Sequence, residues 1–340
     1  MTTATRTPSF RVRAEAAARA WRQAAGLDPG KHQHWLQLND ANDGRNFLHP
    51  AVWPLVQARH ALDKGIGLER TTTNLLASQA MAFNVFGPLV PGVAGGMPAD
   101  AVLRQCWPGI ASVERIRFEY TPARLKPDAE EPPEADPFGD QSARGGVDAD
   151  LRIDFRHQDG ARGVLLVETK FVETGFSGCA YRGRSRTRCP DGTVVAADGG
   201  NCCYSTRARG PFRYWKHSLD GRVLDMATVR SGPCPFGGGL WQPWLNATLA
   251  STIATAETRT APSDPVRHAW YGVIAPCGNL ALHEETQPDA ITALRRFMTR
   301  PDDVRLVALE DVITAIGSVA TSTPDQQVWV AGLQARYVIA

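Results

Sequence analysis

Two oppositely charged residues, Glu168 and Lys170, stand at the end of an apolar run. Residues 163–171, GVLLVETKF, predict a strand whose continuous apolar side chains are buried on both faces of a sheet. Side chains alternate along a strand, so the two charged groups project from the same face. A buried strand that ends in this way either closes with a structural ion pair or holds its charges for a reactant.

A third charged residue, Asp150, belongs to the segment before this strand. ADLRIDF (149–155) alternates, with apolar side chains on one face and Asp150 among the polar ones. Between the two segments, HQDGARG predicts a hairpin turn around residues 159–160. Folding about that turn places position 150 opposite 169 or 170, so we expect both carboxylates and the ammonium group to converge.

This group of side chains is suited to the hydrolysis of a phosphodiester bond. Two carboxylates supply the hard oxygen ligands that Mg²⁺ prefers, and Mg²⁺ keeps several waters while taking further ligands from phosphate. The metal lowers the pKa of a bound water, and a lysine can orient or activate that water and balance charge in the transition state. In its sequence context the pattern favours such a site over a plain ion pair between Glu168 and Lys170.

Sequence alone leaves open which aspartate joins Glu168 and Lys170. Asp148, Asp150 and Asp154 all fall on the same side of the alternation, so the pleat cannot choose among them. Asp150 is preferred because Leu151, directly after it, starts the apolar face. Asp148 is the alternative, whereas Asp154 lies deeper in the hairpin.

A basic segment follows the charged strand end. Residues 172–230 carry ten Lys or Arg against five Asp or Glu, an excess that can meet phosphates. Aromatic residues interleave with them, which is compatible with base stacking or with packing of a loop onto the core. The alternative for the whole segment is a solvated loop. The arginines predicted to contact DNA are Arg182, Arg184, Arg186, Arg188, Arg207 and Arg209.

The seven cysteines do not form a metal-binding motif. They are odd in number, and no pair has C-x-x-C spacing. Four of them fall between residues 179 and 203, in a Gly-rich region. Free thiols are therefore expected there, with a zinc or iron–sulfur site as the alternative.

Composition limits the class of protein. The 340 residues are 43% hydrophobic and 21% charged, with a net charge of +2, which is typical of a soluble globular chain. No apolar run reaches the roughly 20 residues that cross a bilayer. The N-terminus lacks the apolar core of a secretory signal. It is rich in Arg, Ala and Thr, so an amphipathic helix is expected and a mitochondrial transit peptide is the alternative. We expect a cytoplasmic protein that does not enter membranes.

The predicted elements follow the order α–β–β–β–α–β–α–β–α, which fits a mixed sheet flanked by helices. Helices are predicted at 9–26, 49–62, 69–89, 240–258, 289–300 and 311–320, and strands at 112–120, 149–155, 163–171, 266–276 and 304–310. We expect an N-terminal helical region at 1–68. The rest of the chain divides into a main domain at 69–320, which carries an insertion at 175–240, and a C-terminal helical extension at 321–340. Motifs for nucleotide binding, serine hydrolases and zincins are absent.

Asp150 followed by Glu168–Thr169–Lys170 resembles the D-(x)n-E-x-K motif of the PD-(D/E)xK nuclease superfamily. The stretches SQAMAFNVFGPL, VETKFVE, LWQPWLNATLA and VRLVALEDVI are similar to a bacterial family of restriction-endonuclease-like proteins. The resemblance implies an αβββαβ core, DNA as substrate, Mg²⁺ or Mn²⁺ as cofactor and a homodimer as the acting form. The literal Pro-Asp of the motif is absent, since GVDADLRID offers three acids instead.

The resemblance also implies roles for residues around the motif. Asp150, Glu168 and Lys170 would be catalytic, and Glu119 on the preceding strand would join Asp150 and Glu168 in holding metal. Glu173 would support the site, and Gln242 at the start of a helix would contact substrate. The alternatives are that Glu119 is an exposed strand residue, that Glu173 begins a loop and that Gln242 is a polar residue at the start of a helix. Two other functions stay open, namely an inactive nucleic-acid-binding module and a protein whose Cys-rich insertion binds metal.

Overall fold

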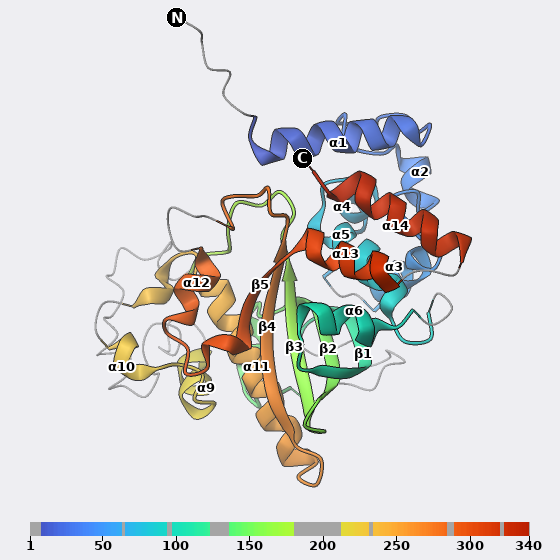
Figure 1. Ribbon diagram of the computed structural model, residues 1–340. Helices are drawn as coiled ribbons and strands as arrows, with labels where there is room; N and C mark the ends of the chain where they lie inside the picture. The colour runs from blue at the N-terminus through green and yellow to red at the C-terminus, as the bar shows by residue number, and fades with distance from the viewer. Residues whose placement is uncertain are drawn as a thin grey trace, which may run out of the picture.

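The centre of the computed structural model is a five-stranded mixed sheet (Figure 1). The structure describes residues 8–62, 65–93, 97–122, 136–179, 212–230, 234–283, 289–319 and 323–339. The strands are β1 (Ile110–Tyr120), β2 (Ala149–His157), β3 (Arg162–Thr169), β4 (Val266–Ala275) and β5 (Val304–Ala308). They lie in the order β1-β2-β3-β4-β5, with β1, β2 and β3 antiparallel and β3, β4 and β5 parallel.

Helices cover both faces of the sheet. One face packs against α9 (Tyr214–Asp220), α10 (Met226–Val229), α11 (Trp241–Thr260) and α12 (Ala290–Arg295). The other packs against a larger helical layer made of α1 (Phe10–Ala24), α2 (Leu38–Asn42), α3 (Val52–Ala61), α4 (Leu68–Thr73), α5 (Ser78–Phe86), α6 (Ala99–Cys106), α13 (Leu309–Val319) and α14 (Pro324–Tyr337). Short 3-10 helices occupy Gly87–Leu89, Gln141–Gly145, Pro235–Gly237 and Pro301–Asp303.

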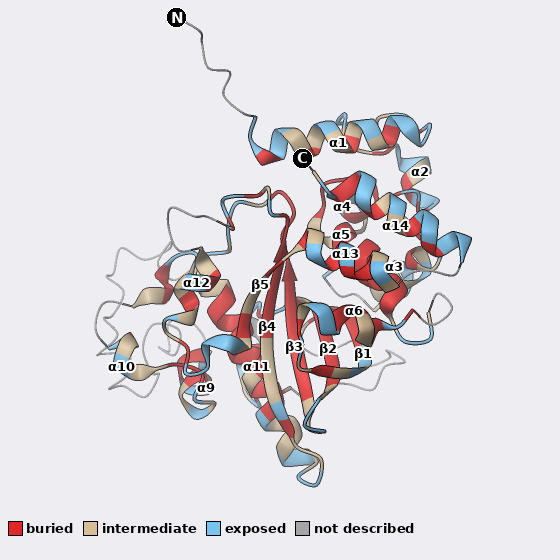
Figure 2. Ribbon diagram, viewed as in Figure 1, coloured by how far each residue is buried: buried red, intermediate tan, exposed pale blue. Residues whose placement is uncertain are grey.

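The apolar run of β3 is buried on both faces, as its composition predicted (Figure 2). Leu165 and Val167 enter the core beneath the larger helical layer. Val164 and Leu166 enter the core beneath α11. A strand in this central position has two protein layers around it, so charged groups at its end are shielded from bulk water.

The helix predicted at 69–89 is wrong as a single element. The chain forms α4, leaves helical geometry at Asn74 and starts again as α5 at Ser78. Threonine hydroxyls at the end of α4 donate back to main-chain carbonyls one turn earlier, which favours a break. Asn74 Oδ1 then accepts from Leu76 N, closing a side-chain turn. The break lets α5 point its first residues at the end of β3.

The hairpin register also differs from the prediction. Leu151 pairs with Val167 and Arg156 with Arg162. Position 150 therefore falls beside 168 rather than beside 169 or 170. The turn holds Gly160 at φ 83°, a left-handed conformation that glycine adopts without strain. A second difference is α6, a helix between the predicted elements at 69–89 and 112–120, where no element was predicted.

Candidate active site

Glu168 and Lys170 form a contact at the end of β3. Lys170 Nζ lies 2.9 Å from Glu168 Oε1, and the two side chains are only 11% and 8% exposed. The prediction that both project from one face is confirmed. Lys170 Nζ also lies 5.2 Å from the centre of the Phe176 ring, so the ammonium group has an acid on one side and an aromatic face on another.

Asp150 reaches the same strand end from β2. Its Oδ2 accepts two hydrogen bonds of 2.6 Å, from the main-chain N and from Oγ1 of Thr169. Thr169 lies between Glu168 and Lys170, so Asp150 is tied to the motif through the residue whose side chain points the other way. Its second carboxylate oxygen accepts no hydrogen bond among the described residues. Asp148, the alternative partner, is exposed.

Two further acids, Glu119 and Asp148, affect the ionisation of this group. Burial raises the pKa of Glu119 well above its usual range, and Asp150, Asp148 and Glu168 add to the effect. The pKa of Asp148 is likewise raised, first by desolvation of its carboxyl group among neighbouring protein atoms and then by Asp150, although the side chain still reaches solvent. Glu119 adopts φ 48°, which is uncommon for a residue with a side chain, and Arg59 Nη2 donates to its carbonyl at 2.8 Å. The acids therefore interact electrostatically with one another at the ends of adjacent strands.

The same interactions act on the residues of the motif. Burial, with a smaller contribution from Asp150, raises the pKa of Glu168 to about 8, although Lys170 opposes the rise. Burial also raises the pKa of Asp150, against the two hydrogen bonds from Thr169. For Lys170 burial lowers the pKa, but Glu168, Asp150 and Glu173 outweigh it, so the net pKa is raised. Lys170 is thus held as a cation, while the negative charges of the acids are only partly neutralised.

Helix α11 brings two amides to the outer side of Glu168. Gln242 Nε2 donates to Glu168 Oε1 at 2.8 Å, and Asn246 Nδ2 donates to Oε2 at 3.4 Å. The two residues are four positions apart and so lie on one face of the helix. Gln242 Oε1 also accepts from Ser177 N at 3.2 Å, which ties the chain after β3 to the helix. Gln242 lies in the first turn of α11, and its contact with substrate stays a prediction.

Glu173 supports the turn that follows Lys170. Its Oε2 accepts from the main-chain N of Phe171 at 2.8 Å and of Val172 at 3.1 Å, while Oε1 accepts from Ser78 Oγ at 2.9 Å. Asn279 Nδ2 donates to the carbonyls of Phe171 and Glu173. These contacts fix the strand end against the first residue of α5.

A cavity of about 330 Å³ opens beside Asp150. Its wall is formed by the chain before α4 and by the first turn of α5, where Gln79 Nε2 donates to Gly65 O at 3.1 Å. The lining residues are Gly65, Gly67, Arg70, Thr71, Ala77, Ser78, Gln79 and Asp150. The cavity is large enough to admit part of a ligand next to the carboxylate.

The donor set fits a hard divalent cation. Asp150 and Glu168, with Asp148 and Glu119 nearby, supply carboxylate oxygens. Desolvation raises the pKa of each of them, and a bound cation would oppose that rise by stabilising the charged form. Within the described ranges no three of these acids bring their ligand atoms within 4.8 Å of one another. An open arrangement of this kind suits Mg²⁺, which keeps several waters in its coordination shell.

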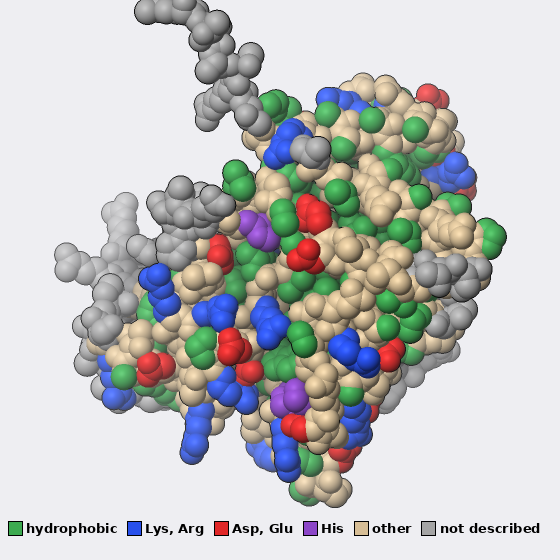
Figure 3. All heavy atoms as spheres, viewed as in Figure 1, with side chains coloured by type: hydrophobic (Ala, Val, Ile, Leu, Met, Phe, Trp, Pro, Cys, Tyr) green, Lys and Arg blue, Asp and Glu red, His purple; other side chains and the backbone are tan. Residues whose placement is uncertain are grey.

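Several predicted residues are not seen at this site. The six arginines from Arg182 to Arg209 and Cys189, Cys202 and Cys203 fall outside the described residues. Tyr214 and Trp215 are buried in the core beneath α11, so they are not available for base stacking. Figure 3 shows Lys and Arg side chains spread over the lower half of one face with acidic side chains between them, rather than a single basic patch. No helix in the described parts of the chain is long and apolar enough to span a bilayer.

The stability of the fold is expected to fall as the pH rises from about 4.5 to about 8. The pKa of Glu168 is raised from 4.5 to about 8, so in this window the folded chain holds a proton that the unfolded chain has released. Below the window both states hold the proton, and above it both have lost it. Thermal midpoints measured across the window should decline less steeply for Glu168→Gln than for the native chain, and equal slopes would contradict the assignment.

Comparison with known proteins gives one match. A search of curated proteins and a search of solved structures each found none. A family model described as the PD-(D/E)XK nuclease superfamily matches residues 5–189, which is 185 of the 340 residues and includes Asp150, Glu168 and Lys170. The mixed sheet flanked by helices agrees with the restriction-endonuclease-like fold of that superfamily. The chain belongs to the PD-(D/E)XK nuclease superfamily.

Proposed function

We propose that the chain is a divalent-metal-dependent endonuclease that hydrolyses phosphodiester bonds in DNA. The observation that carries the proposal is the meeting of Asp150, Glu168 and Lys170 at adjacent strand ends, next to an open cavity. Membership of a nuclease superfamily supports phosphodiester chemistry. Defence against foreign DNA is the role that the resemblance to restriction-endonuclease-like proteins favours.

Asp150 and Glu168 would hold the metal, Mg²⁺ or Mn²⁺, with Glu119 as a further ligand. When bound, the cation would lower the pKa of a coordinated water and offset charge on the phosphoryl group. Asp150 already uses one carboxylate oxygen for Thr169, which leaves the other oriented for a ligand. Gln242 and Asn246 keep the Glu168 carboxylate in place on its far side, so that it does not rotate freely.

Lys170 would act on the attacking water. Its ammonium group can donate a hydrogen bond that orients the water oxygen, and its charge balances negative charge as it develops on the phosphate. The net rise in its pKa supports a cation in this position. The cavity beside Asp150 would receive the sugar–phosphate backbone, and the arginines between Arg182 and Arg209 would contact the flanking phosphates.

The test is cleavage of supercoiled plasmid DNA. Nicked or linear products are expected with Mg²⁺ or Mn²⁺ and not with EDTA, and binding should weaken steeply as salt rises because phosphate contacts release counterions. Binding that survives EDTA with no cleavage under any metal would favour the alternative of an inactive nucleic-acid-binding module. If the chain neither bound nor cut DNA or RNA, nucleic acid would be abandoned as the substrate.

A further inference from the structure

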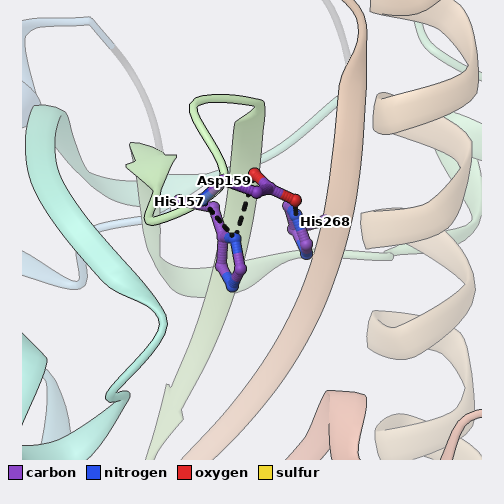
Figure 4. A group of neighbouring side chains, drawn as sticks. All are labelled: His157, Asp159 and His268. Carbon is purple, nitrogen blue, oxygen red and sulfur yellow. Dashed lines mark hydrogen bonds and ion pairs between the residues drawn. The ribbon is translucent and has the colours of Figure 1, made fainter.

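Three metal-ligating side chains meet at the end of the sheet opposite the candidate active site (Figure 4). His157 is the last residue of β2, Asp159 lies in the hairpin turn, and His268 lies near the start of β4. β3 runs from this turn to Thr169, so the length of a strand separates the group from Glu168 and Lys170. Nothing in the proposed nuclease chemistry uses these three residues.

The ligand atoms are close enough to share one ion. His157 Nδ1 lies 3.0 Å from Asp159 Oδ1, and His268 Nε2 lies 2.9 Å from Asp159 Oδ2. All three ligand atoms lie within 4.8 Å of one another. Ligands around a tetrahedral zinc ion, at about 2.0–2.1 Å from the metal, stand roughly 3.3 Å apart. Small side-chain rotations would therefore suffice to close the group around a metal.

The contacts of His157 Nδ1 compete with one another. The main-chain N–H of Asp159 donates to His157 Nδ1 at 3.2 Å. The same nitrogen lies 3.0 Å from Asp159 Oδ1, which already accepts from Ala161 N at 2.9 Å. An imidazole nitrogen offers one lone pair or one N–H, so a proton or a metal ion between Nδ1 and Oδ1 would join these two atoms in place of the bond from Asp159 N.

The two imidazoles present a stacked pair of rings to the Asp159 carboxylate. The rings of His157 and His268 are stacked with centres 3.7 Å apart and planes inclined by 21°. Each neutral ring can donate one N–H to Asp159, and a metal ion would replace those two protons while both imidazoles stay neutral. The edge of Trp270 packs against both rings. A Cβ on Gly109 would lie 2.6 Å from His157 Nε2, so glycine allows the chain before β1 to close against that ring.

We propose that His157, Asp159 and His268 bind one divalent transition-metal ion, such as Zn²⁺, and thereby join the β2–β3 turn to β4. Two imidazoles and a carboxylate suit zinc, whereas Mg²⁺ prefers oxygen ligands alone. The histidines are 22% and 20% exposed and the aspartate 49%, so solvent can fill the remaining coordination position. The join crosses the point where the β3–β4 register shifts, between Arg162 and Gly163, so the metal would stabilise an irregular part of the sheet.

The test measures zinc binding to the metal-stripped full chain by calorimetry and elemental analysis. The native chain should bind one more equivalent of zinc than His268→Gln, and zinc should raise the thermal midpoint of the native chain by more than that of the variant. Asp159→Asn provides a second variant, since it keeps an oxygen for Ala161 N and so preserves the turn. His60→Gln changes an exposed histidine of α3 and should bind as much zinc as the native chain.

Zinc bound by cysteines elsewhere in the chain would be common to all these proteins, so the difference between them isolates this site. Co²⁺ can replace zinc as a spectroscopic probe. The equivalent of Co²⁺ that the native chain binds and the variants do not should show no thiolate charge-transfer band, because its ligands are nitrogen and oxygen. An excess of Mg²⁺ should not displace it. Equal zinc stoichiometry in the native chain and in both variants would overturn the proposal, as would a lost equivalent that carries the thiolate band.

Discussion

Replacing Lys170 with alanine is expected to lower the rate of DNA cleavage by at least about 100-fold while DNA binding persists. The substitution removes the ammonium group that contacts Glu168 and, in the proposed mechanism, orients the attacking water. An interaction made mainly in the transition state affects turnover more than affinity. Single-turnover cleavage of plasmid DNA, measured beside a binding titration, separates the two effects.

The variant should still fold, which makes the measurement informative. Lys170 lowers the pKa of Glu168, so its loss lets that carboxyl group take up a proton instead of remaining as a buried, uncompensated charge. Lys216→Ala is the matched control, because within the described residues Lys216 pairs with Asp220 on α9 and both side chains are exposed. Its expected effect on stability lies within about 0.5 kcal/mol. A Lys170→Ala protein that folds and cuts at the native rate would rule out the proposed role.

Asp150 and Asp148 can be compared in the same assay. Asp150→Asn should be as damaging as Lys170→Ala, because it weakens a carboxylate that is held by Thr169 and lines the cavity. Asp148 is exposed, so Asp148→Asn should retain more activity. The reverse order would assign the ligand to Asp148, the alternative that the alternation of the strand left open.

The central hairpin was predictable because its information is local. Alternation in β2, the apolar run of β3 and the turn between them each follow from a few neighbouring residues, and together they bring Asp150, Glu168 and Lys170 to one strand end. The error of one or two positions in register arose at the turn, where loop geometry rather than composition decides the pairing. The order of the remaining strands and helices followed from the same local patterns.

Contacts between distant segments could not be read in the same way. Asn246 reaches Glu168 across 78 positions and Ser78 reaches Glu173 across 95 positions, and only the packing of α11 and α5 on the sheet brings them together. The contact of Asn246 has a weak signal in the sequence, since Asn246 lies one helical turn after Gln242 and so on the same face of the helix. His157 and His268 are ordinary strand residues in the sequence and become neighbours because β3, which continues from the hairpin, pairs with β4.

The end of the chain also contributes to the position of the active site. Asn84 on α5 donates to Tyr337 Oη at 2.9 Å, and Trp329 Nε1 donates to the carbonyl of Asn84 at 2.7 Å. Both partners belong to α14, which lies beside α1 on the far side of the helical layer (Figure 1). Because α5 begins at Ser78 and carries Gln79 into the cavity wall, α14 fixes from behind the helix that faces Asp150.

Replacing Arg336 with alanine is expected to lower the free energy of unfolding by about 3–5 kcal/mol. Arg336 is 1% exposed, and its guanidinium group donates to Asn46 O at 2.7 Å, to Asn46 Oδ1 at 2.5 Å and to Leu75 O at 3.0 Å. It also lies 5.0 Å from the centre of the Trp21 ring. Alanine would leave these acceptors buried without their donor and open a cavity between four segments. Denaturant unfolding followed by circular dichroism measures the loss.

The size of this effect should depend on the geometry of the guanidinium group and not on charge alone. Arg336→Lys keeps the charge but cannot donate to three separated acceptors in a planar fork, so it should fall between alanine and the native chain. Arg11→Ala is the control from the same helical layer. In the described part of the chain Arg11 pairs with Glu15 near the surface, and its loss should change stability by less than about 1 kcal/mol. If Arg336→Lys were as stable as the native chain, the network would be electrostatic rather than directional. If Arg336→Ala lost no stability, the contacts of Arg336 with Asn46 and Leu75 would not be what holds α14 against the rest of the helical layer.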